Sequence, residues 1–307
     1  MNSTSNISLV SEEMRVVQEI EALIKINLRP YTEIHDHYFS NYPEAVVNGY
    51  MVKDAHLRKL RLMDLKSIVS LPEVIGTLSF LEELWLTSNQ FQSLPNSISN
   101  LKELKVLKLN FNNLKGIPES IGGLSKLQVF ELSNNNVTSL PKSIRLLDNL
   151  VKLNLSSNLL SELTTSIRHI HRLRQLSVAG NHLIEIPSEI CTLSNLSLLD
   201  LSHNQLTQLP TCFGNFSALE RLNLSNNNLV KLPDSFGNLE RLRELRLNKN
   251  KIQILPELIS KMKFLKILNL TDNPLSSENR PLIDILQKQG VLVSYGSWEK
   301  GYDTFTK

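Results

Sequence analysis

Residues 104–124 read LKVLKLNFNNLKGIPESIGGL, and this stretch is one copy of a unit that recurs every 23 residues. The unit has the form L-x-x-L-x-L-x-x-N-x-L-x-x-L-P-x-x-I-x-x-L-x-x. Nine asparagines keep its register at a constant spacing of 23 residues: Asn89, Asn112, Asn135, Asn158, Asn181, Asn204, Asn227, Asn250 and Asn273. An uninterrupted repeat of this length predicts an α/β solenoid, in which each unit contacts only its neighbours.

Each part of the unit predicts a part of one coil. The first, fourth and sixth positions are apolar, so a short strand can point them inward. The asparagine carries amide donors and a carbonyl acceptor, which can satisfy buried turn groups within and between coils. The Leu-Pro pair and the following Ile or Phe would build the convex wall. Full repeats begin at Leu81, Leu104, Leu127, Leu150, Leu173, Leu196, Leu219, Leu242 and Leu265, and a degenerate repeat, with Leu65 in place of asparagine, begins at Leu57.

The segments flanking the repeats predict caps. A helix can begin at Ser11 and end before Pro30, and Asn48-Gly49 predicts a type I′ hairpin turn between residues 46–52. After residue 275, Ser277 can cap a helix that Gly290 closes, and residues 291–295 read as a last strand. We therefore divide the chain into residues 1–56 (tail, helix and hairpin cap), 57–275 (solenoid) and 276–307 (cap and tail). Whether the first helix only caps the stack or also docks a partner stays open.

Composition bears on the compartment and the partner. The net charge of +3, from 33 basic and 30 acidic residues, is too balanced to indicate a nucleic-acid partner. We see no secretory signal and no apolar run that could span a membrane. Cys191 and Cys212 occupy different places in consecutive repeats, so we expect two free thiols in a reducing compartment. These observations predict a cytoplasmic protein, and we expect it to be a monomer.

The repeat L-x-x-L-x-L-x-x-N-x-L-x-x-L-P-x-x-[IF]-x-x-L closely resembles the Ras-group leucine-rich repeats of intracellular scaffolds. The resemblance covers residues 57–275, and the ending at 273–295 is also similar to that group. It implies a curved horseshoe with a parallel sheet on its concave face. It also implies protein binding, in some members to small GTPases or phosphatase subunits, and a role in signal transduction.

Alternation along each strand predicts that its third, fifth and seventh positions face outward on the concave side. Two candidate binding clusters result. The N-terminal cluster is Trp85, Val106, Lys108, Phe111, Val129 and Glu131, an aromatic set among charges, which is the composition of an interface hot spot. The C-terminal cluster is Asp200, His203, Arg221, Glu244, Arg246 and Lys249. The alternatives are that Trp85 lies across its neighbours or packs on the hairpin, and that the C-terminal cluster is an ordinary solvated face.

Catalytic and cofactor sites are not indicated. The chain has no Gly-rich phosphate loop and no G-x-S-x-G, and neither cysteine has an evident activating partner. His35 and His37 flank Asp36, but no third ligand follows at a diagnostic metal spacing. We therefore expect no enzymatic activity, no cofactor and no metal.

The sequence thus predicts a scaffold that holds a protein partner on its concave face, and the resemblance implies a signalling protein such as a small GTPase. Two alternatives stay open. One is a structural or assembly role through the convex face or the tail. The other is recognition of a small ligand or glycan by polar residues of the central repeats, namely Asn154, Ser177 and Asn223.

Overall fold

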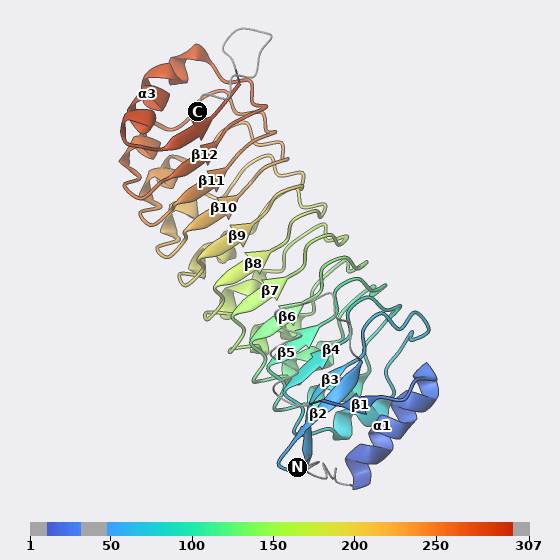
Figure 1. The fold of residues 1–307 in the computed structure, drawn as a ribbon. Helices are drawn as coiled ribbons and strands as arrows, with labels where there is room; N and C mark the ends of the chain where they lie inside the picture. The colour runs from blue at the N-terminus through green and yellow to red at the C-terminus, as the bar shows by residue number, and fades with distance from the viewer. Residues whose placement is uncertain (1–10, 32–47, 297–307) are drawn as a thin grey trace, which may run out of the picture. The chain divides into compact units, whose positions relative to one another are not determined.

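The computed structural model describes residues 11–31 and 48–296, and its contacts divide the chain into two units, Met1–Leu150 and Val151–Lys307 (Figure 1). We describe each unit by itself. Both are built from coils of one kind, in which a three-residue strand is followed by a return that carries a short 3-10 helix. This is the α/β leucine-rich-repeat solenoid that the 23-residue pattern predicts.

The described residues of the first unit, 11–31 and 48–150, begin with α1 (Ser11–Ile24) and contain six strands. They are β1 (Arg29–Pro30), β2 (Gly49–Lys53), β3 (His56–Arg61), β4 (Glu83–Trp85), β5 (Val106–Lys108) and β6 (Val129–Glu131). The 3-10 helices are η1 (Glu73–Thr77), η2 (Asn96–Asn100), η3 (Glu119–Gly123) and η4 (Lys142–Leu146). Strands β3 to β6 pair in parallel and in sequence order, whereas β2 pairs with β3 in antiparallel fashion.

The second unit contains seven parallel strands in sequence order. They are β7 (Lys152–Asn154), β8 (Gln175–Ser177), β9 (Leu198–Asp200), β10 (Arg221–Asn223), β11 (Glu244–Arg246), β12 (Ile267–Asn269) and β13 (Leu292–Ser294). Its 3-10 helices are η5 (Thr165–His169), η6 (Ser188–Thr192), η7 (Thr211–Asn215), η8 (Asp234–Asn238), η9 (Glu257–Lys261) and η10 (Ser277–Asn279). Helix α3 (Arg280–Lys288) follows the last 3-10 helix and precedes β13 (Figure 1).

The core of each coil consists of the apolar positions of the repeat. In the coil that begins at Leu104, the side chains of Leu104, Leu107 and Leu109 have no exposed surface, and neither do Ile121 and Leu124 on the return. The residues on either side of the buried middle residue of each strand keep some exposure. The prediction that the first, fourth and sixth positions point inward is therefore confirmed, and the third and fifth positions form the outer face of the strands.

The ladder asparagines are bonded as predicted, and all of them except the partly exposed Asn273 are buried. Asn181 is 4% exposed, and its Oδ1 accepts from the N–H of Leu160 at 3.0 Å in the preceding coil. Its Nδ2 donates to the carbonyls of Leu155 at 3.0 Å and Val178 at 2.9 Å. The side-chain amide of Asn181 therefore links two coils and also closes its own turn. Because both of its N–H groups and its oxygen are bonded, it fixes the register between the coils and leaves no buried donor unpaired.

Consecutive returns meet at residues 21 positions apart. A Cβ placed on Gly122 would lie 2.8 Å from Ser143 Cβ, and one placed on Gly76 would lie 2.6 Å from Ser97 Cβ. In both pairs the residue just after the apolar position of one 3-10 helix faces the residue just before that position in the next. Glycine allows this close approach because it has no side chain.

The expectation of free thiols at Cys191 and Cys212 is wrong, since these two residues form a disulfide with a Cα–Cα distance of 6.0 Å. They lie on η6 and η7 at the contact of residues 21 apart that Gly122 and Ser143 also make. The different places of the two cysteines in consecutive repeats predict that they are unpaired. The structure shows that this offset is what brings neighbouring returns together.

The N-terminal end of the first unit is covered by α1. Val16, Val17, Ile20 and Ile24 are buried, and the helix ends where Lys25 adopts a φ of 56°. Glu13 is only 5% exposed, and its carboxylate accepts from the N–H of Leu57 at 2.9 Å. A buried carboxylate is stable when hydrogen-bonded, so this contact anchors the helix to β3.

The hairpin prediction is wrong in position. The antiparallel turn lies at Asp54 and Ala55, whose φ values are 53° and 62°, and it joins β2 to β3. Asn48 instead brackets the main chain of Met63, accepting from its N–H and donating to its carbonyl at 2.9 Å. Gly49 is required by close packing, because a Cβ there would lie 2.2 Å from the Arg29 carbonyl oxygen on β1. Residues 46 and 47 lie outside the described residues.

The predicted helix and last strand are present near the C-terminal end of the described residues, but the prediction that Ser277 caps the helix is wrong. Ser276 caps η10, where its hydroxyl accepts from the N–H of Glu278 at 3.3 Å, and α3 begins only at Arg280, after Asn279, which makes no side-chain cap bond. Gly290, the predicted closing residue, has a φ of 83°. Asn279 lies outside the 23-residue register and is 3% exposed. It acts as a further ladder asparagine, because its Oδ1 accepts from the N–H of Leu255 at 2.8 Å.

Candidate interaction surfaces

The N-terminal cluster lies on three adjacent strands of the first unit. Trp85, Lys108 and Glu131 are register partners at the fifth position, and Val106 and Val129 are partners at the third. All five side chains are half-buried. The structure therefore brings these predicted residues together on one face.

Trp85 is held between two cations. The guanidinium carbon of Arg61 lies 4.1 Å from the centre of its ring, and the Nζ of Lys108 lies 3.8 Å from that centre. Arg61 is 2% exposed, and its guanidinium also lies 5.1 Å from the Tyr31 ring. Such contacts contribute about 0.5–2 kcal/mol each, more when desolvated. The ring thus lies across its neighbours, as the alternative interpretation of Trp85 proposed.

Phe111 is the exposed aromatic of the N-terminal cluster. It follows β5 in the left-handed region, with a φ of 57°, and 55% of its surface is exposed. Other coils use mainly small or polar residues there, namely Ser88, Asn134, Ser157, Gly180, His203, Asn226, Lys249 and Asp272. A bulky residue is disfavoured in this conformation, so neither backbone strain nor burial accounts for phenylalanine at this position.

Glu131 is bound within the first unit. The Nδ2 of Asn110 donates to its carboxylate at 3.0 Å, while the Oδ1 of Asn110 accepts from the N–H and hydroxyl of Ser133 at 2.8 and 2.9 Å. At the neighbouring Glu82, the Lys105 ammonium, 2.6 Å from the carboxylate, lowers the pKa of the carboxyl below its usual 4.5. The carboxylates of this face are therefore already engaged in ion pairs and hydrogen bonds.

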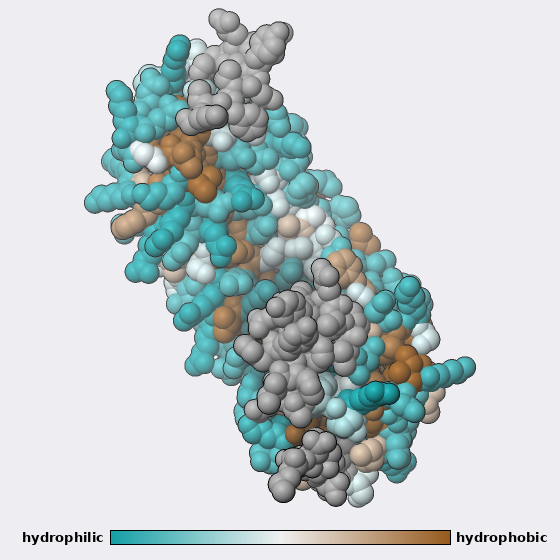
Figure 2. Space-filling model, in the orientation of Figure 1, coloured by the Kyte–Doolittle hydropathy of each residue, from teal (hydrophilic) through white to brown (hydrophobic). Residues whose placement is uncertain are grey.

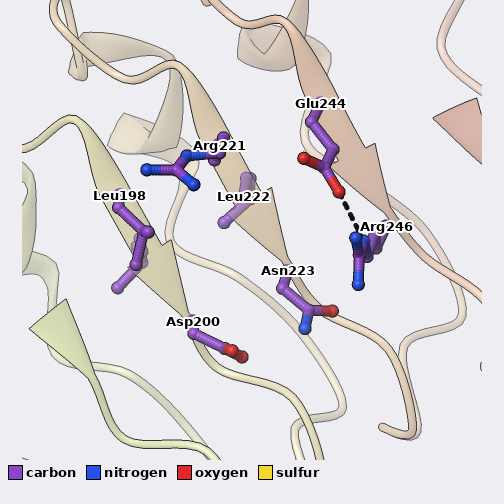
Figure 3. A pocket seen from close by; sticks show the side chains of 8 residues that line it. Leu198, Asp200, Arg221, Leu222, Asn223, Glu244 and Arg246 are labelled. Atoms are coloured by element: carbon purple, nitrogen blue, oxygen red, sulfur yellow. Dashed lines mark hydrogen bonds and ion pairs between the residues drawn. The ribbon is translucent and has the colours of Figure 1, made fainter. Parts of the chain in front are cut away.

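The C-terminal cluster surrounds a small pocket in the second unit. The pocket has a volume of about 140 Å³ and is lined by Leu198, Leu199, Asp200, Arg221, Leu222, Asn223, Glu244 and Arg246 (Figure 3). The Nε of Arg246 donates to the Glu244 carboxylate at 2.5 Å. Figure 3 shows the Arg221 side chain directed toward Leu198 and away from Glu244. His203 and Lys249 are exposed and follow β9 and β11 in the left-handed region, with φ values of 54° and 57°.

Polar residues at the fifth position share a local hydrogen-bonding motif. Asn154 accepts from the N–H of Ser156 at 3.0 Å, and Asp200 accepts from the N–H and hydroxyl of Ser202 at 3.0 and 2.7 Å. Asn223 does the same for Ser225. One oxygen of each side chain therefore stabilises the turn that follows its own strand, so fewer hydrogen-bonding groups remain to bind a small ligand.

The pattern of exposed apolar side chains adds residues that sequence reasoning missed. Ile267 on β12 is 41% exposed, and its register partner Leu292 on β13 is 69% exposed. Figure 2 shows apolar surface at this end of the second unit. The third-position alternation places both residues outward, but Leu292 follows a cap helix and lies outside the 23-residue repeat.

The described part of the chain holds no group of three or more His, Cys, Asp or Glu residues that could bind a metal. The triplet of His35, Asp36 and His37 lies outside the described residues. None of the helices in residues 11–31 and 48–296 is both long and apolar enough to cross a membrane.

Comparison with family models identifies the repeat. A model described as a leucine-rich repeat region matches residues 158–289, and a second leucine-rich-repeat model matches residues 79–137, 103–160 and 125–183. Together they cover more than half of the sequence. The chain is a leucine-rich-repeat protein. Comparison with curated proteins gave no match.

Solved leucine-rich-repeat structures are similar to this chain. The functional domain of InlJ from Listeria monocytogenes, described as including a cysteine ladder, aligns with a TM-score of 0.62 at 25% identity, over 72% of this chain and 45% of that one. The internalin InlF from Listeria monocytogenes aligns with a TM-score of 0.53 at 20% identity, over 85% of this chain and 87% of that one. The second likeness shows the fold alone. Leucine-rich-repeat proteins are generally scaffolds for protein interaction, and they are typically not enzymes.

Proposed function

We propose that this leucine-rich-repeat protein is a non-catalytic scaffold that binds a protein partner on the outer face of its strands. The observation that carries the proposal is Phe111, which is 55% exposed although it occupies a left-handed position. An exposed aromatic side chain at a site that disfavours it, three residues after the end of β5 at Lys108, is typical of an interface hot spot. In this proposal residues 57–275 are the binding body, and 1–56 and 276–307 serve as its ends.

The test compares two single variants in proximity crosslinking from the native cells. Phe111→Asn removes the aromatic group and places there a residue that tolerates a positive φ. Leu146→Gln is the matched control, because Leu146 is 51% exposed on η4, in the same unit but on the return. We expect the partner to be lost with Phe111→Asn and retained with Leu146→Gln. Equal capture by both variants would refute this role of Phe111.

The compartment decides the class of partner. The 23-residue repeat with its Leu-Pro pair supports a Ras-group type, and with it a cytoplasmic protein whose partner is a signalling protein such as a small GTPase. The disulfide between Cys191 and Cys212 supports an oxidising compartment instead, where the partner would be an extracellular or cell-surface protein. A cysteine ladder in InlJ is in line with the second assignment.

One measurement separates these two assignments. The protein is isolated from its native cells into a thiol-alkylating agent and its intact mass is determined. Two alkylated cysteines assign the protein to a reducing compartment and support a partner of the GTPase type. An unmodified mass, with alkylation only after reduction, assigns it to an oxidising compartment.

A further inference from the structure

The third positions of the last five strands form a row with a definite chemical order. Register pairing places Leu198, Arg221, Glu244, Ile267 and Leu292 side by side on β9 to β13. The row therefore reads apolar, basic, acidic, apolar, apolar. Neighbouring strands lie about 4.8 Å apart, so Arg221 and Ile267 are separated by roughly 10 Å along the row.

Arg221 is the available charge in this row. Its register partner Glu244 is already bound by Arg246 at 2.5 Å, on the same strand. The nearby Asp200 accepts two hydrogen bonds from Ser202. Arg221 is exposed and forms no ion pair with any residue in 11–31 or 48–296. Arg246 thus holds the carboxylate that lies between the two arginines, and the guanidinium of Arg221 is directed toward Leu198 at the pocket (Figure 3).

The apolar end of the row is open. Leu292 and Ile267 are 69% and 41% exposed, although they are paired side by side on β13 and β12. Two large aliphatic side chains next to each other on a sheet face offer a surface that an apolar partner residue can cover.

We propose that this row binds an extended acidic–apolar segment of the protein partner, which deepens the proposed scaffold function and rests on it. A carboxylate of the segment pairs with Arg221, and apolar side chains about three residues further along cover Ile267 and Leu292. The spacing follows because an extended chain advances about 3.3 Å per residue, so three residues span the roughly 10 Å from β10 to β12. Arginine suits a carboxylate because its planar guanidinium donates two parallel hydrogen bonds to the two carboxylate oxygens.

The experiment is selection from a display library of random 12-residue peptides on the full-length protein and two charge reversals. Arg221→Glu inverts the available charge. Lys251→Glu is the matched control, because Lys251 is exposed in the adjoining coil and follows the ladder Asn250 rather than lying on a strand. Circular dichroism establishes that all three proteins are folded before selection.

We expect wild type and Lys251→Glu to enrich peptides with Asp or Glu about three residues before an apolar pair. Arg221→Glu should enrich Lys or Arg at the same place and bind the wild-type peptides at least tenfold more weakly. Leu292→Ser should keep the acidic preference and lose the apolar one.

Three results would overturn the proposal. Enriched peptides without an acidic preference would refute the role of Arg221 while leaving the scaffold function intact. An acidic preference that survives Arg221→Glu would do the same. Dimerisation of the wild type that Leu292→Ser abolishes would assign the apolar pair to a second copy of this chain. The scaffold function itself is decided separately by the Phe111→Asn crosslinking test.

Discussion

Two asparagines of the ladder make the same hydrogen bonds at different depths, and this allows the cost of burial to be measured directly. Asn181 is 4% exposed, and Asn273 is half-exposed in the last full repeat. Asn273 accepts from the N–H of Ile252 at 3.0 Å and donates to the carbonyls of Leu247 and Leu270 at 2.9 and 3.0 Å. The equivalent bonds of Asn181 are 2.9–3.0 Å long.

We expect Asn181→Ala to lower the free energy of unfolding by about 3 kcal/mol and Asn273→Ala to lower it by about 1 kcal/mol. In the first variant the N–H of Leu160 becomes a buried donor without an acceptor, which costs about 1–3 kcal/mol in addition to the lost bonds. In the second variant water can replace the side chain, so only the net value of the bonds is lost.

The assay is urea unfolding followed by far-UV circular dichroism. With a slope of about 2–3 kcal/mol per molar urea, the midpoint of Asn181→Ala should fall by about 1 M and that of Asn273→Ala by a third of this. Both residues belong to the second unit, so the same transition reports on both. Equal midpoint shifts for the two variants would refute the reasoning, because the bonds are matched and only the burial differs.

Three further outcomes follow from the structure. Cys191→Ser should lower the free energy of unfolding by about 3 kcal/mol, because the bond to Cys212 closes a loop of 21 residues; the loss should disappear when both proteins are compared under reducing conditions. The N–H of Ser143 lowers the pKa of the Glu119 carboxyl, and Lys105 lowers the pKa of the Glu82 carboxyl. Both carboxylates therefore stabilise the folded state above about pH 4.5, and this contribution is lost as the pH falls below that value. Glu119→Gln should flatten the acid limb of a plot of unfolding midpoint against pH, and an unchanged limb would contradict this. Phe111→Asn should leave thermal stability unchanged or raise it by up to about 1 kcal/mol, since asparagine tolerates the left-handed backbone, and a loss of more than that by calorimetry would show that Phe111 is structural.

The fold could be predicted from sequence wherever the same type of residue recurs at one position of the repeat with the same structural role. The apolar residues at the first, fourth and sixth positions and the ladder asparagines repeat without interruption, so their burial and bonding follow from the pattern alone. The ends are different, because each residue there occurs once. Asn48 lies next to Gly49 and so has the signature of a hairpin turn, yet the pair serves an asparagine bracket on Met63 and a close contact with Arg29.

At the candidate site, the alternation of residues along the strands predicts which side chains share a face but not which of them contact one another. Alternation correctly placed Trp85, Lys108 and Glu131 on one face. It could not show that Arg61 is buried beneath the Trp85 ring, because that contact depends on how β3 is covered by its own neighbours. It also could not show which of two arginines holds Glu244, since Arg221 and Arg246 are both within reach in the sequence pattern and only side-chain geometry selects one.

Because neighbouring returns meet at residues 21 positions apart, positions for further disulfides can be chosen from residue numbers alone. On a return, the residue just after the apolar position of the 3-10 helix faces the residue at its own number plus 21, as long as both belong to the same unit. Pairs that contain a glycine are excluded, because a Cβ added at Gly76 or Gly122 would lie 2.6 or 2.8 Å from the Cβ of its serine partner, closer than the roughly 3.5–4.5 Å between the Cβ atoms of a disulfide. A second disulfide can therefore be introduced at Ser99 and Ser120, which lie on η2 and η3 at places equivalent to those of the two cysteines. Each disulfide added along the returns would link one more coil covalently to the next.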